Sequence, residues 1–81
     1  MMVYGGAMTL QELPVGETAC VAGVRGSNDI SKRLMEMGVV PGVRVRVVKT
    51  APFGDPMEIR LLGYNLALRQ NEAASVEVEG R

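Results

Sequence analysis

The sequence predicts a mainly β fold, a small antiparallel barrel of five short strands with one short α-helix and a short helical turn near the N-terminus. A helical pattern ends at Gly38, and Pro41 lies just beyond it. Short runs of alternating polarity come next, and Gly, Pro, Asp and Asn residues separate them. Strands of this length and spacing are typical of small barrels, in which closing the sheet removes its exposed edges.

The length of the chain allows one domain, because 81 residues bury only a modest core. We expect a flexible N-terminal extension over residues 1–7 and a barrel domain over residues 8–81. The first residues lack the basic region and the continuous apolar stretch of a secretion signal. No apolar run approaches the roughly 20 residues that span a bilayer. A single cysteine also fits a reducing compartment. These features predict a cytoplasmic protein without direct membrane insertion.

The first elements are a helical turn and a strand. Thr9 and Glu12 have the spacing of a capping box, in which each side chain accepts a backbone N–H, so residues 10–13 are expected to form one helical turn. Pro14 ends that turn. Residues 17–25 then alternate between two faces that both carry small side chains. Small side chains suit the narrow interior of a barrel, which favours a strand here.

The single helix is predicted from Asp29 onward. Ser27 is a good N-cap residue, because its hydroxyl can accept a backbone N–H of the first turn. Apolar residues then recur on one helical face: Ile30, Leu34 and Met37. Gly38 can adopt the left-handed conformation that ends a helix, and Pro41 cannot extend it.

Four further strands are predicted, over residues 43–47, 57–62, 64–69 and 76–79. In the first of them, valines alternate with Arg44 and Arg46, so the valines are expected inside and the arginines outside. Gly63 marks a tight connection between the second and third strands. Residues 70–72 are interpreted as a break before the last strand.

The composition argues against an enzyme and against a general nucleic-acid binder. Nine basic and nine acidic residues cancel, whereas phosphate affinity depends on an excess of positive charge. The segment from Arg25 to Arg69 is nevertheless basic, with eight basic and four acidic residues, a net charge of +4. The chain has no histidine, and Cys20 lies among small apolar residues, where we expect a buried and unreactive thiol.

A closed metal site is not expected, because such a site takes three or four ligands at defined spacing. Cys20, Asp55 and Glu58 are weak candidates for ligands of a weakly bound Fe²⁺ or Zn²⁺. The alternative interpretation is that Asp55 shapes the turn before Pro56 and that Glu58 is a solvated strand residue. We therefore expect no cofactor, with weak metal binding kept as an alternative.

Protein binding is the favoured kind of function. The only Phe of the chain, Phe53, lies between two prolines in a predicted surface loop, where it is either an exposed anchor or a lid folded over the barrel. The predicted partner-binding residues come from this loop, the helix and the first strand after it: Pro52, Phe53, Asp55, Pro56, Arg33, Met35, Arg44 and Arg46. Together with Lys49 and Arg60, Arg44 and Arg46 form a basic band that is either a solvated face or a contact for an acidic partner.

Three segments in this order resemble the FeoA family: Lys-Arg-Leu-Met-Glu-Met-Gly-Val-Val-Pro-Gly at 32–42, Ala-Pro-Phe-Gly-Asp-Pro at 51–56 and Gly-Tyr-Asn-Leu-Ala-Leu-Arg at 63–69. The resemblance covers nearly everything from Met8 to Val78. It implies an SH3-like barrel that serves as a cytoplasmic accessory protein of FeoB-type ferrous iron uptake, with the FeoB-like transporter as its partner. The alternatives are a metalloregulator-type SH3-like domain and a weak transition-metal-binding module, and a homo-oligomer stays open.

Overall fold

The computed structural model describes residues 8–80, so the predicted flexible extension over residues 1–7 lies outside the described residues. The strands are β1 (Met8–Thr9), β2 (Thr18–Val24), β3 (Arg44–Thr50), β4 (Met57–Leu61), β5 (Tyr64–Leu68) and β6 (Val76–Gly80). The helices are α1 (Asn28–Glu36) and α2 (Gln70–Ala74), and two 3₁₀ turns cover Leu10–Glu12 and Pro52–Gly54. The predicted mainly β fold is confirmed, with antiparallel pairing throughout.

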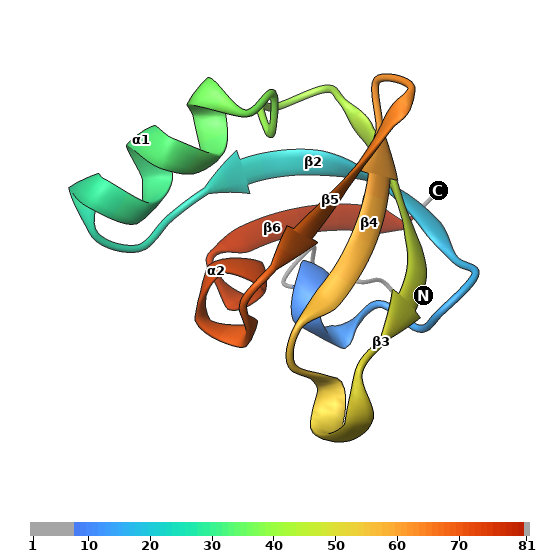
Figure 1. Ribbon diagram of the computed structural model, residues 1–81. Coiled ribbons are helices and arrows are strands. Elements are labelled where there is room, and N and C mark those ends of the chain that lie inside the picture. The colour runs from blue at the N-terminus through green and yellow to red at the C-terminus, as the bar shows by residue number, and fades with distance from the viewer. Residues whose placement is uncertain (1–7, 81) are drawn as a thin grey trace.

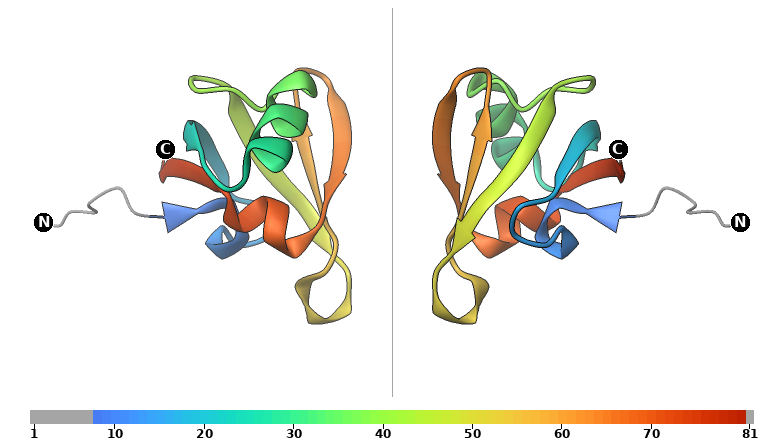
Figure 2. Two further views of the ribbon diagram at one scale, coloured as in Figure 1. Left: turned by 90° about the vertical axis from the view of Figure 1, so that its left-hand side faces the viewer. Right: turned by 90° about the vertical axis from the view of Figure 1, so that its right-hand side faces the viewer.

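The strands form one curled sheet with the order β1-β6-β2-β3-β4-β5 (Figure 1). Hydrogen bonding does not close this sheet within the described residues, because β1 and β5 are its two ends. The helix α2 carries the chain from β5 back to β6 across this gap. Figure 2 shows α1 lying across the opening between β2 and β6 on one side and β4 and β5 on the other. The barrel is therefore partly open and is completed by helices.

The structure adds two elements to those that the sequence predicts. The strand β1 pairs Met8 with Val78 and Thr9 with Glu77. The helix α2 occupies residues 70–74, where the sequence predicts a break before the last strand, so that prediction is wrong. The N-terminal helical turn is confirmed, and the Glu12 carboxylate accepts the Thr9 N–H at 2.9 Å as the capping box predicts.

The core lies between the inner faces of the strands. Alternate residues of β3, β4 and β6 are buried, namely Val45, Val47, Met57, Ile59, Leu61, Val76 and Val78. This alternation confirms the predicted faces, because a strand directs successive side chains to opposite sides. Arg44 and Arg46 accordingly lie on the outer, exposed face.

The helix α1 is attached to the core by its apolar face. The Ser27 hydroxyl caps its first turn by accepting the Ile30 N–H at 3.3 Å, as expected. Leu34 is fully buried, and Ile30 and Met37 pack against the same core. Neither α1 nor α2, the two α-helices of the described residues, is long and apolar enough to cross a membrane.

Gly38 ends α1 next to the β4–β5 hairpin. Its φ of +96° belongs to the left-handed region, and a Cβ built there would lie 2.9 Å from Leu62 Cδ1. The Tyr64 hydroxyl donates a hydrogen bond to the Met37 carbonyl beside it. The end of the helix is thus fixed to the tip of the hairpin.

Replacing Gly38 by alanine is expected to lower the free energy of unfolding by about 1–2 kcal/mol, because a left-handed alanine is strained and its methyl group displaces Leu62. Gly42→Ala is a matched control, because Gly42 has a φ of +95° with nothing within 4 Å of the added Cβ. Urea denaturation of both variants separates the backbone strain from the contact. Equal losses in the two variants would contradict the role of the Leu62 contact.

Candidate functional site

Phe53 projects from the loop between β3 and β4, and its side chain is 99% exposed. The loop is closed by backbone hydrogen bonds from Gly54 N to Ala51 O at 2.8 Å and from Ala51 N to Pro56 O at 2.9 Å. Phe53 itself has a left-handed φ of +68°. Figure 1 shows this loop extending beyond the body of the barrel. Of the two predicted roles for Phe53, the lid is therefore wrong, and the side chain is presented to solvent.

Asp55 has a structural role in the same loop. Its Oδ1 atom accepts the N–H of Gln70, the first residue of α2, at 3.1 Å. A carboxylate at this position satisfies one free N–H and complements the positive end of the helix. Asp55 thereby connects the loop that carries Phe53 to α2, while Pro52 and Pro56 are exposed on either side of Phe53.

The predicted partner-binding residues do not form one continuous patch. The end of α1 leads into the start of β3, whereas the Phe53 loop follows the end of β3. A strand of seven residues spans about 20 Å, so the helix end and the loop lie at opposite ends of the barrel (Figure 1). The predicted set therefore falls into two surfaces, the Phe53 loop (residues 51–56) and the surface made by α1 and the outer face of β3.

Arg33 and Met35 occupy different positions on α1. Met35 is 44% exposed, as expected for a side chain off the apolar face of the helix. Arg33 Nη1 lies 3.4 Å from Oε2 of Glu72, the buried carboxylate of α2. The other oxygen, Oε1, accepts the Arg69 N–H at 2.8 Å. Arg33 thus compensates a buried charge and joins α1 to α2, which limits its availability to a partner.

Replacing Glu72 by alanine is expected to lower the free energy of unfolding by about 1–3 kcal/mol, because the Arg69 N–H loses its acceptor and α1 loses its ionic contact with α2. Glu72→Gln keeps an oxygen for Arg69, so its loss should be smaller. Arg33→Ala should cost less still, since the Arg33 side chain is 68% exposed. Thermal and urea unfolding measure this order. A larger loss in Arg33→Ala than in Glu72→Ala would contradict it.

The predicted basic band is reduced to three arginines. Lys49 Nζ lies 3.8 Å from Glu58 Oε1, so the Lys49 charge has a partner. Within residues 8–80, no ion pair is formed by Arg44, Arg46 or Arg60. We call these three residues the arginine face.

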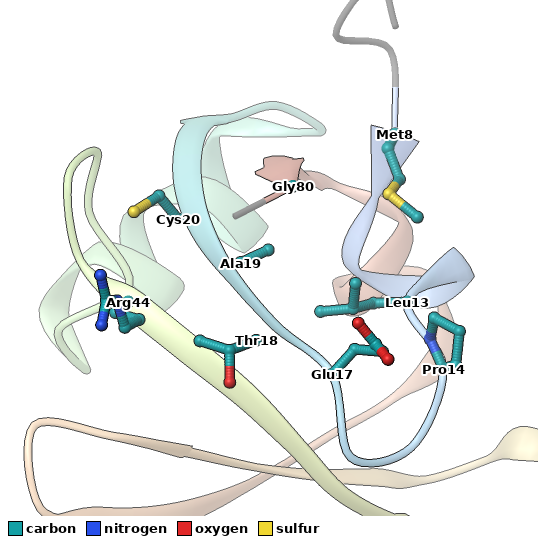
Figure 3. A pocket seen from close by; sticks show the side chains of 9 residues that line it. All are labelled: Met8, Leu13, Pro14, Glu17, Thr18, Ala19, Cys20, Arg44 and Gly80. Atoms are coloured by element: carbon teal, nitrogen blue, oxygen red, sulfur yellow. The ribbon is translucent and has the colours of Figure 1, made fainter.

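Cys20 lies on the outer face of β2, directly opposite Arg44 of β3. The expectation of a buried thiol is wrong, because Cys20 is only half-buried. It lines an open hollow of about 630 Å³ together with Thr18, Glu17 and Arg44, while Met8, Leu13, Pro14, Ala19 and Gly80 complete the lining (Figure 3). The ionisable side chains of this hollow are Glu17, Cys20 and Arg44, so no imidazole or second thiol stands beside Cys20.

The structure does not bring the three candidate metal ligands together. Asp55 accepts the Gln70 N–H, and Glu58 Oε2 accepts from Asn65 Nδ2 at 2.7 Å. Cys20 lies on another strand, β2. In the part of the chain that is described, no three His, Cys, Asp or Glu side chains are grouped to hold a metal ion. Weak Fe²⁺ or Zn²⁺ binding stays a prediction from the sequence.

Leu62 is an exposed apolar residue that the sequence-based selection missed. It forms the two-residue turn of the β4–β5 hairpin with Gly63, and both residues have positive φ, +50° and +86°. Its side chain is 66% exposed. The Leu-Gly pair between two alternating runs was the available signal, because such hairpin turns favour residues other than leucine at the first position.

Comparison with known proteins identifies one family. The sequence model described as the FeoA domain matches residues 8–80. A Porphyromonas gingivalis protein, described as a fusion of Fe(2+) transport protein A and the Fe(2+) transporter FeoB, is 43% identical over 72 residues. That match covers 89% of this chain and 8% of the relative, so the chain spans only a small part of the relative's length.

Solved structures agree in fold. FeoA of Stenotrophomonas maltophilia, a prokaryotic SH3 domain protein determined in complex with zinc, is 42% identical, with a TM-score of 0.80 over 90% of this chain and 91% of that one. A manganese-dependent transcriptional repressor in complex with manganese reaches a TM-score of 0.87 at 18% identity, over 98% of this chain and 39% of the repressor. The second likeness concerns the fold alone.

Proposed function

The chain belongs to the FeoA domain family, a family linked to ferrous iron transport, and from this premise we propose that it is an accessory protein that binds the cytoplasmic side of a FeoB-type transporter. The P. gingivalis relative supports this proposal, because it joins the two functions in one polypeptide. Covalent linkage keeps two partners at a high effective concentration. A separate chain has to reach the same association through its own surface.

The exposure of the Phe53 side chain is the observation that supports the proposed mode of binding. A fully exposed phenylalanine in a loop closed by two backbone hydrogen bonds is presented without first being ordered. Aromatic side chains that enter a pocket of the partner supply much of the binding energy of protein interfaces. We assign Phe53 as the central anchor, with Pro52 and Pro56 as its apolar neighbours.

The accessory role requires no chemistry by this chain. Binding changes the behaviour of a transporter when the bound protein prefers one of its conformational states, and the size of the change is limited by that preference. The Phe53 loop would bind one state of the transporter more tightly than another. The direction of the effect on uptake follows from which state is preferred.

Iron uptake by vesicles that contain the FeoB-type transporter of the same organism tests this role. The initial rate of Fe²⁺ uptake is measured with increasing amounts of the chain, and a saturable change in either direction is expected. Phe53→Ala protein is the matched control and should require a higher concentration for the same change. An uptake rate that is unaffected by the unmodified chain would contradict the proposed function.

A further inference from the structure

We propose that the arginine face binds an acidic, extended peptide segment that carries an apolar residue two positions before and two positions after a Glu or Asp. This inference goes further than the proposed function by giving the chemistry of the partner, and it rests on that function only for the assumption that the segment belongs to a protein partner. It concerns the outer side of β3 and β4, which lie side by side in Figure 1.

Two positive charges meet on the outer side of β3 and β4. Arg46 of β3 lies directly opposite Arg60 of β4. Like charges in directly opposite positions destabilise an antiparallel pair. Arg60 is held by neutral acceptors, with Nη1 2.8 Å from Asn65 Oδ1 and Nη2 3.3 Å from the Gly63 carbonyl. These contacts fix the guanidinium without neutralising it, so an anion between Arg46 and Arg60 would relieve their repulsion.

The neighbouring pair on these strands, Lys49 and Glu58, differs from the arginine pair because its charges are opposite. Lys49 lies opposite Glu58 on the same two strands, and their charges are 3.8 Å apart. The same face therefore contains one compensated position and one position with two cations. Glu58 Oε2 also accepts from Asn65 Nδ2, and Asn65 Oδ1 accepts from Arg60, so a neutral amide stands between Glu58 and Arg60 and the two form no direct ion pair. Within residues 8–80 neither Arg46 nor Arg60 forms an ion pair, so a bound carboxylate would be their first direct counter-ion.

The surface is hollowed on either side of Arg46 and Arg60. Arg46 and Arg60 line two hollows, one of about 200 Å³ that also contacts Leu62 and one of about 480 Å³ that also contacts Val15 and Val48. These three apolar side chains are exposed by 66%, 55% and 37% respectively. The arginine pair thus separates two hollows that each have an apolar wall.

The spacing of these features matches an extended chain. Arg44 and Arg46 are two residues apart on β3, which corresponds to roughly 6.7 Å along a strand, and Arg44 is next to the hollow at Leu62. Val48 lies beyond Arg46 at the irregularity of the β3–β4 pairing between Val47 and Lys49, where the regular alternation of the strand ends. A bound extended segment directs every second side chain to the same side with the same spacing. A carboxylate over Arg46 and Arg60 then directs one apolar side chain toward the hollow at Leu62 and the other toward the hollow lined by Val15 and Val48. Arg44 lies beside the Leu62 hollow and can contact a second carboxylate.

An acidic protein segment fits this surface better than a nucleic acid. Nucleic-acid affinity depends on many phosphate contacts, whereas the arginine face has three cationic side chains and the nine acidic and nine basic residues of the chain cancel. A phosphate backbone also leaves the apolar walls at Leu62 and Val48 without a partner. Arginine pairs well with carboxylates, because its fork of N–H donors matches their two oxygens.

The test is fluorescence anisotropy with three labelled synthetic peptides. The probe is Ser-Thr-Leu-Thr-Glu-Thr-Val-Thr-Ser, the second peptide replaces its Glu by Gln, and the third replaces its Leu and Val by Thr. Each peptide is titrated with the full chain and with the variants Arg46→Gln, Arg60→Gln and Lys49→Gln. Thermal unfolding of each variant verifies that the fold is kept.

The acidic probe is expected to bind saturably and to lose about tenfold or more in affinity with Arg46→Gln or with the Gln peptide, because each change removes a charged hydrogen bond. The Thr peptide should also bind more weakly. The Lys49→Gln variant should change the affinity by less than about twofold, because Lys49 is already paired with Glu58 in the unmodified chain. Absence of saturable binding, or equal affinity of the Glu and Gln peptides, would overturn the proposal. In a competition experiment, displacement of the bound probe by an unlabelled RNA oligonucleotide but not by the unlabelled acidic peptide would also overturn it. The transporter takes no part in this assay, so its outcome is independent of the proposed function.

Discussion

Replacing Phe53 by alanine is expected to weaken binding to the cytoplasmic region of a FeoB-type transporter about 30-fold, which corresponds to about 2 kcal/mol for a central aromatic anchor. The ring makes no buried contact within the chain, because it is 99% exposed. The free energy of unfolding should therefore stay within about 0.5 kcal/mol of that of the unmodified protein. Titration calorimetry and urea denaturation measure the two quantities.

The matched control is Phe53→Leu, which keeps an apolar side chain at the same place. It should lose less affinity than the alanine variant, since part of the apolar area is retained. If the alanine variant bound the transporter region as tightly as the unmodified chain, Phe53 would not be the anchor. If it unfolded much more easily, its effect on binding could not be attributed to the interface.

Replacing Leu34 by alanine is expected to lower the free energy of unfolding by about 3 kcal/mol, because the variant loses buried apolar area and leaves a cavity. Leu34 is the fully buried residue of α1. For a domain of 81 residues this loss is a large part of a total stability of about 4–12 kcal/mol. Urea denaturation measures it directly.

Met35→Ala is the control for Leu34, because Met35 is its neighbour in α1 but is 44% exposed. We expect a loss below about 1 kcal/mol in this variant. Similar losses in the two variants would contradict the assignment of Leu34 as the residue that attaches α1 to the core. A small loss in both would mean that the contacts of Ile30 and Met37 suffice.

Most of the fold is predictable from local patterns. Alternating valines and arginines in β3 are sufficient to predict which side chains are buried, because the period of two is a direct consequence of strand geometry. The beginning and end of α1 follow from Ser27 and Gly38, each of which has a specific backbone role.

The elements that were missed depend on distant parts of the chain. With two residues, β1 is too short for a periodic pattern and exists through its pairing with β6. The five residues of α2 likewise carry no helical repeat, and Asp55 satisfies its first N–H from 15 residues away. Contacts of this kind are created by the tertiary structure and cannot be derived from residues 70–74 alone.

The candidate binding residues likewise divide into features that local sequence predicts and features that depend on tertiary contacts. The exposed Phe53 and the outward arginines follow from the residue types and from their places in a loop and a strand. The sequence does not reveal that Lys49 has an ion-pair partner while Arg46 has none among residues 8–80, because this depends on the register between β3 and β4. Nor does it reveal the distance between the helix end and the Phe53 loop, which separates residues that were expected to act together.

The central claim is that the chain acts by binding a FeoB-type transporter, and titration calorimetry between the unmodified chain and the cytoplasmic region of the transporter tests it most directly. The account predicts saturable binding with a defined stoichiometry, and a dissociation constant that rises about 30-fold when Phe53 is replaced by alanine. Absence of a saturable signal up to the solubility limit of both proteins would contradict the claim, whereas saturable binding that is unaffected by Phe53→Ala would contradict only the assignment of Phe53 as the anchor.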